Sequence, residues 1–139
     1  MLIGTYRHSL DAKKRMRMPS KLKSEIGSNF IITKGTANNL LVFSKEDFDV
    51  LYKKLTSLPI FNEEVQKPIR KFLSSAFEAE EDAQGRVLLP KELCGFAGIT
   101  KNIVFVGVGN RVEIWAEETW DKVDGEEEVD FSALANLGV

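Results

Sequence analysis

The sequence has 139 residues, 43% hydrophobic and 29% charged, a composition typical of a single globular domain. No apolar run approaches the roughly 20 residues of a membrane span, and the N-terminus lacks the charged head and apolar core of a secretory signal. Cys94 is the single cysteine, so an internal disulfide is excluded, and we expect a buried thiol in a cytoplasmic protein.

The net charge of −2 conceals a strong asymmetry along the chain. Residues 1–36 carry eight basic and two acidic side chains, whereas residues 37–139 carry eleven basic and nineteen acidic ones. A basic end on an acidic body predicts an oriented interaction with a polyanion.

Residues 2–10 predict a strand, and Asp11 begins a turn because its carboxylate can accept hydrogen bonds from nearby backbone N–H groups. Residues 15–18 alternate Arg, Met, Arg, Met, so both methionines should face a core while Arg15 and Arg17 face outward. A solvated strand face is the simpler interpretation. The surrounding cations favour a polyanion site instead; the candidate residues are Arg7, His8, Lys13, Lys14, Arg15 and Arg17.

A short helix is predicted after Pro19, a hairpin over residues 30–43, and a helix over residues 44–55 with Ser44 as its N-cap. The second of these helices has an apolar stripe that we expect to be core: Phe48, Leu51, Tyr52 and Leu55. Residues 63–77 predict another helix, packed against both halves of the chain, with a kink or a late start at Pro68.

The chain then repeats its own beginning. Residues 11–19 read DAKKRMRMP and residues 82–90 read DAQGRVLLP, and each copy continues with a helical turn, a strand, a Gly/Asn turn, a second strand and a helix start. A unit of about fifty residues buries too little surface to be stable alone, so the copies should pack together or interlock.

The two copies differ mainly in charge. Gly85 fits a left-handed position of the second turn, where the first turn has Lys14. The other first-copy cations become Glu78, Gln84 and Leu88, and only Arg15 persists, as Arg86. We therefore expect copy one, and not copy two, to form the face that binds a polyanion, because an acidic face repels phosphates. Asp11 and Asp82 should each brace a turn by pairing with the arginine four residues later.

With two Asp-x-x-x-Arg motifs, each in a β-β-α-β-β unit with a trailing helix, nearly the whole chain resembles the MraZ family. The resemblance implies an α+β, β-rich fold in which two tandem swapped-hairpin repeats, similar to those of the AbrB and SpoVT transcription factors, form a pseudo-dimeric, barrel-like core with packed helices. The expected parts are repeat 1 at 5–48, a linking helix at 62–77, repeat 2 at 76–120 and an acidic tail at 124–139, the end of which is a short helix or frayed.

The resemblance also implies a function. Family members are bacterial regulators that bind short repeated promoter elements upstream of their own division and cell-wall operon. They assemble into ring-like homo-oligomers, and repression is the expected effect. The expected partners are double-stranded DNA and further copies of the chain, in the cytoplasm and nucleoid, with no membrane, cofactor or metal.

Three alternatives remain to be weighed. Enzyme activity is disfavoured because His8 is the only histidine and the sequence has no metal-ligand spacing or Gly-rich phosphate loop. A scaffold whose basic face binds an acidic protein is distinguished from a DNA-binding protein by salt dependence. An AbrB-like antitoxin would resemble one copy with a disordered tail, which two copies and a short tail argue against.

Overall fold

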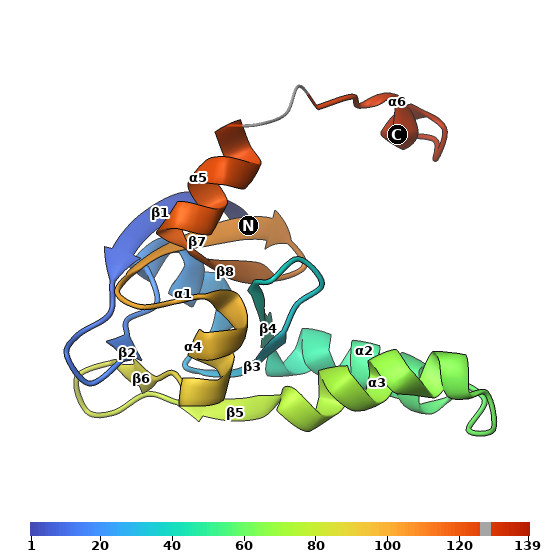
Figure 1. The fold of residues 1–139 in the computed structure, drawn as a ribbon, viewed down its shortest axis with the longest axis horizontal. Helices are drawn as coiled ribbons and strands as arrows, with labels where there is room; N and C mark the ends of the chain where they lie inside the picture. Colours follow the sequence, from blue (N-terminus) through green and yellow to red (C-terminus); the bar gives the residue numbers. More distant parts are fainter. Residues whose placement is uncertain (126–128) are drawn as a thin grey trace.

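The computed structural model describes residues 1–125 and 129–139. In this part of the chain, a six-stranded antiparallel sheet in the order β1-β7-β8-β4-β3-β5 and a two-stranded sheet, β2-β6, combine with six helices (Figure 1). The strands are β1 (Leu2–Ser9), β2 (Arg15–Met16), β3 (Asn29–Lys34), β4 (Leu40–Ser44), β5 (Phe77–Glu80), β6 (Val87–Leu88), β7 (Asn102–Gly109) and β8 (Val112–Ala116). The helices are α1 (Ser20–Ile26), α2 (Lys45–Thr56), α3 (Glu63–Ser75), α4 (Lys91–Ala97), α5 (Glu117–Gly125) and α6 (Ser132–Ala135).

Each half of the chain gives its first strand to the other half. β1 pairs with β7 of the second half, and β5 pairs with β3 of the first half, both antiparallel. The two hairpins meet at the centre of the sheet, where β4 pairs with β8. The equivalent strands of the two repeats are β1 and β5, β3 and β7, and β4 and β8. Exchanging the members of each pair gives the same strand order read from the other edge, which is the arrangement of an interlocked pseudo-dimer.

The α+β, β-rich class is confirmed, but the sheet is not a closed barrel. A closed barrel requires its edge strands to pair, whereas β1 and β5 lie at opposite ends of the strand order. The hydrophobic core instead lies between the large sheet and a layer made of β2, β6, α1 and α4. Side chains of that layer therefore cover the side on which a barrel would close.

The core follows the predicted alternation of residues 15–18. Met16 and Met18 are buried with Phe30, Ile32 and Phe105 in one cluster. Cys94 is also buried there, as expected for a small apolar residue, and burial raises the pKa of its thiol.

The helices α2 and α3 form a hairpin that extends from the sheet (Figure 1). Ser44 caps α2 as predicted, its hydroxyl accepting from the backbone N–H of Asp47 at 3.1 Å. The apolar stripe of α2, however, is not core: neither helix contains a buried residue. Phe48 and Phe72 stack between the helices, and α3 runs through Pro68 without ending. The helices cover one another only partly, so periodicity identified the apolar face but not its degree of burial.

Ionic contacts between the two halves have opposite polarity at equivalent positions. Arg7 of β1 lies 3.5 Å from Glu117, the first residue after the second hairpin. At the equivalent place, Glu78 of β5 pairs with Lys45, the first residue after the first hairpin. The same contact is therefore made twice with the charges exchanged.

A second pair of equivalent positions is occupied by an ion pair at one place and by apolar residues at the other. The Glu81 side chain is only 8% exposed, and Lys23 Nζ of α1 lies 2.9 Å from its Oε2 atom. Among described residues this oxygen accepts no well-aligned hydrogen bond, so Lys23 is its charge partner. The equivalent positions hold Leu10 and Cys94, which are both buried.

Lys23→Ala is expected to lower the free energy of unfolding by about 2 kcal/mol, because it leaves a buried carboxylate unpaired. Lys23→Ala combined with Glu81→Leu should recover most of this loss, since the pair then resembles the apolar one. Urea unfolding measures both. Lys21→Ala, on the exposed side of α1, is the control; a loss as large as that of Lys23→Ala would contradict the assignment.

Candidate nucleic-acid interface

The two Asp-x-x-x-Arg turns lie side by side. β2 pairs antiparallel with β6, placing Arg15 opposite Leu88 and Met16 opposite Val87. The pairing continues where the backbone N–H of Leu89 donates to the carbonyl of Lys14 at 3.0 Å. We call residues 11–17 and 82–88 together the paired-loop surface; it lies at the end of the molecule that carries β2 and β6 (Figure 1).

Each turn is braced by its aspartate. Asp11 Oδ1 accepts from the backbone N–H groups of Lys13 and Arg15, both at 2.9 Å, and Asp11 Oδ2 accepts from Arg15 Nε at 2.7 Å. Asp82 repeats the pattern with Gln84 and Arg86, each contact being 2.9 Å. The backbone N–H bond from Arg15 or Arg86 is the main cause that lowers the pKa of each carboxyl, and the arginine side chain adds to it.

The two turns are also joined to one another. Arg86 Nη1 of the second turn lies 3.9 Å from Asp11 Oδ2 of the first. Arg15 and Arg86 are both half-buried, so these guanidinium groups serve mainly to hold the loops together.

Lys14 has a left-handed backbone, so the first turn has the same shape as the second although it lacks the glycine. Its φ is +61°, where the equivalent Gly85 has +76°. A side chain at such a position costs about 1–2 kcal/mol relative to the right-handed region. Its ammonium group donates to the carbonyl of Thr100, before β7. Strain of this kind at a non-glycine residue is often associated with function.

The structure gathers four of the six predicted cations. Lys13, Lys14, Arg15 and Arg17 follow one another around the first turn, and all except Arg15 are exposed. The two remaining candidates lie on β1.

The candidates on β1 already have partners. Arg7 donates to Asp121 of α5 at 2.7 Å, and this hydrogen bond is the main cause that raises its pKa. His8 packs edge to face on Phe105, with ring centroids 5.5 Å apart. Arg7 therefore reaches a phosphate only by exchanging its carboxylate partner.

The assignment of the DNA face to the first repeat alone stays a prediction, but the structure places the second turn next to the first. Strand exchange brings the second turn beside the first, so Gln84 and the exposed Leu88 belong to the same surface. The nearby acids are partly neutralised, because Glu81 pairs with Lys23 and Glu78 with Lys45. The interlocked arrangement expected from the sequence already implies that the two equivalent turns lie next to each other, so this adjacency could have been predicted.

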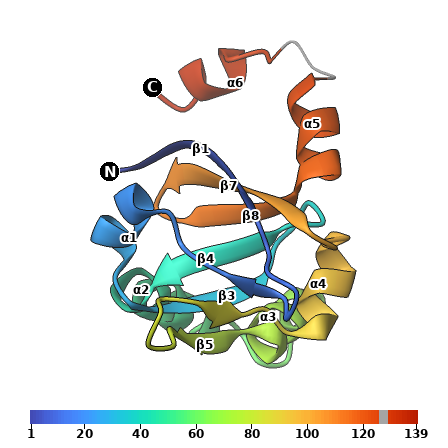
Figure 2. The ribbon, with the colours of Figure 1, turned by 90° about the vertical axis from the view of Figure 1, so that its left-hand side faces the viewer.

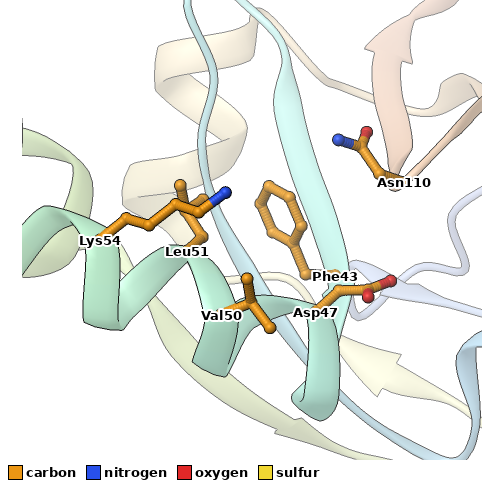
Figure 3. A pocket seen from close by; sticks show the side chains of 6 residues that line it. All are labelled: Phe43, Asp47, Val50, Leu51, Lys54 and Asn110. Atoms are coloured by element: carbon orange, nitrogen blue, oxygen red, sulfur yellow. The ribbon is translucent and has the colours of Figure 1, made fainter.

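Residues of α2 line parts of two separate cavities. The smaller one, about 200 Å³, is lined by Phe43, Asp47, Val50, Leu51, Lys54 and Asn110, and Figure 3 shows these side chains between α2 and the β7–β8 turn. Its lining contains no histidine or cysteine. Across residues 1–125 and 129–139, no three metal-ligating side chains gather at one place. None of the described helices has the length and hydrophobicity needed to cross a membrane.

Comparison with known proteins gives a consistent set of relatives. A model of the family "MraZ protein", whose description adds "antitoxin-like", matches residues 1–67 and 72–136. The transcriptional regulator MraZ of Clostridium acetobutylicum is 44% identical over 135 residues, covering 97% of this chain and 94% of that protein. The protein of the same name from Thermoanaerobacter sp. (strain X514) is 41% identical over the same shares. That from Carboxydothermus hydrogenoformans is 43% identical over 87% of this chain and 85% of its own length.

Acid should release the turn braces. Because the folded pKa of Asp11 and Asp82 lies below 3.8, their contribution to stability is present above that pH and is lost as pH falls through the folded pKa. Urea unfolding of the wild type and of the Asp11→Asn/Asp82→Asn variant should therefore show the full difference in stability at pH 6 and a difference that shrinks progressively as the pH falls below 3.8. Asp49→Asn, on exposed α2, is the control, and a difference independent of pH would contradict the bracing role.

Proposed function

The chain belongs to the MraZ family, and from this premise we propose that it is a transcriptional regulator that binds specific sequences in double-stranded DNA. It acts in the cytoplasm and nucleoid as a repressor of its own division and cell-wall operon, at tandem short repeats in the promoter. A regulator of this class is not an enzyme and needs no cofactor for the reading of DNA.

The observation that carries the proposal is the paired-loop surface. The brace between Asp11 and Arg15 fixes the first turn, while Lys13, Lys14 and Arg17 stay exposed on it. Clustered cations neutralise phosphates and release counterions, which supplies most of the affinity for a duplex. A rigid turn loses little conformational freedom on binding, so these contacts are retained at low entropic cost.

We assign different roles to the residues of this surface. Lys13 and Lys14 contact phosphates and position the protein on the duplex, and Arg17 reads a guanine edge in the major groove. Arg15 and Arg86 position the turns, and Arg15 also borders the duplex. Arg7 and His8 contact the backbone at the edge of the site, Arg7 after leaving Asp121.

A single paired-loop surface offers few contacts, so self-association is part of the proposal. A ring-like homo-oligomer presents the same surface several times and gains avidity on tandem elements through effective concentration. The partly exposed apolar faces of α2 and α3 supply surface for such an assembly.

Genomic fragments retained by the protein should contain a short element repeated in tandem, and affinity for such a fragment should fall steeply with salt. The expected slope of log affinity against log salt is about −0.9 per phosphate contacted. Lys13→Ala should reduce the steepness by about one unit for all sequences, whereas Arg17→Ala should cost about 1–3 kcal/mol and relax the preference at one base pair.

Lys122→Ala, on α5, is the matched control for loss of one charge. Fluorescence anisotropy with one-repeat and three-repeat duplexes measures all variants. Equal losses for Lys13→Ala and Lys122→Ala would refute the surface assignment. A salt-insensitive affinity, or retention of acidic proteins in place of DNA, would support the scaffold alternative.

Lys14→Gly should change the stability of the fold and the affinity for DNA in opposite directions. Glycine relieves the left-handed strain but adds freedom to the unfolded chain, so the net gain in unfolding free energy is about 0.5–1 kcal/mol. The same change should weaken DNA binding and reduce the salt slope. Urea unfolding and anisotropy on one sample check both; a variant that is stabilised and binds DNA unchanged would exclude Lys14 from the interface.

A further inference from the structure

The larger cavity next to α2 is a groove of about 700 Å³ between α2, α3 and α4. Its lining is mostly apolar and includes Leu51, Leu55, Val65, Ile69, Phe72 and Phe96. Leu51 and Leu55 belong to the apolar stripe that helical periodicity assigns to a core, yet no residue of α2 or α3 is buried. The fold thus leaves a hollow apolar face that its own helices do not fill.

Two lysines, Lys34 and Lys71, lie together in the lining of the groove, which also includes Glu64. Lys34 Nζ and Lys71 Nζ lie 5.2 and 5.5 Å from the centroid of the Phe96 ring, so two ammonium groups meet at one aromatic side chain. Lys34 has Glu92 as a partner at 3.0 Å, on the exposed surface. A fitting occupant is therefore an apolar segment with negative charge next to it.

The C-terminal segment of the chain has this chemistry. Phe131, Leu134 and Leu137 recur every third residue around α6, and their side chains are 69%, 46% and 79% exposed. Five carboxylates precede or interrupt the apolar residues, and no lysine or arginine follows Lys122; they are Asp124, Glu126, Glu127, Glu128 and Asp130. Charge and hydrophobicity both match the groove.

The arrangement of the helices favours a groove on another copy. In Figures 1 and 2, α5 extends from the upper side of the sheet, whereas α2 and α3 lie along the lower side. α5 packs on β7 and β8, while α2 packs on β4 and α3 on β3. α5 therefore lies at the opposite end of the sheet from the helices that line the groove.

We propose that residues 129–139 of one copy bind in the groove between α2, α3 and α4 of a second copy, with Asp130 and the acidic residues that precede it in the sequence next to Lys34 and Lys71. Groove and segment are different surfaces of the same chain, so the contact is heterologous and can be repeated from copy to copy until a ring closes. This inference rests on the self-association part of the proposed function and names the contact that produces it.

Disulfide trapping in the full-length chain tests the contact. One sample carries Phe131→Cys and the other Leu55→Cys, both with Cys94→Ala, and the two are mixed under mild oxidation. We expect a covalent dimer on a non-reducing gel. Replacing Leu55→Cys by Val50→Cys gives the matched control, because Val50 lies on α2 but lines the smaller cavity (Figure 3). Cross-linking to Val50→Cys should be at least tenfold slower.

Equal rates for the two positions would overturn the proposal. It would also be overturned if a chain carrying both Phe131→Cys and Leu55→Cys linked only within itself at high dilution. Light scattering on each sample keeps the two hypotheses apart. Oligomers without the specific disulfide refute the groove contact alone, whereas a specific disulfide in a protein that binds no duplex refutes only the DNA-binding function.

A second variant avoids changes in the core. Phe131→Asp/Leu134→Asp should raise the dissociation constant of the oligomer at least tenfold, because it places charges on the apolar side of α6. Ser132→Asp/Ala135→Asp adds the same charge to the neighbouring side and should change that constant less than threefold. Equal effects of the two variants would show that net charge, and not insertion into the groove, governs assembly.

Discussion

Neither half of this protein can complete a sheet alone, because each hairpin takes its outer strand from the other half. β1 on β7 and β5 on β3 are the pairings that impose this. Once the strands are exchanged, the chain segments that follow them must meet, so β2 pairs with β6 and both Asp-x-x-x-Arg turns share one end of the molecule. The location of the candidate DNA surface is therefore a consequence of topology.

Within that surface, the two turns have the same backbone hydrogen bonds but different side-chain charges. Both turns use an aspartate that accepts two backbone N–H groups and one guanidinium. The first turn adds Lys13 and Lys14, whereas the second has Gln84 and Gly85 in their places. The paired-loop surface is therefore asymmetric in charge although its two turns have the same backbone and the same brace. Lys14 keeps a left-handed backbone that is strained for a residue with a side chain, whereas the equivalent Gly85 adopts it without strain.

Sequence reasoning succeeded where neighbours in the chain determine the outcome. The alternation at Met16 and Met18 and the cap at Ser44 both depend on residues within four positions. It failed where the decisive partner is distant. Arg7 meets Asp121, 114 residues away, and the second turn meets the first only through exchanged strands. Likewise, periodicity marks the apolar sides of α2 and α3 but cannot tell which surface covers them.

The exchanged charges around the two hairpins bear on how such a chain avoids pairing with the wrong half of a neighbour. If two first halves from different molecules interlocked, Arg7 would face Lys45, and the ammonium group of Lys23 would meet Leu10 in place of the carboxylate of Glu81. Two second halves would bring Glu78 against Glu117 and leave Glu81 beside a thiol. Both like-with-like combinations place equal charges together or leave a charged group without its partner. Pairing between the two different halves of one chain is therefore favoured over pairing between equal halves of two chains.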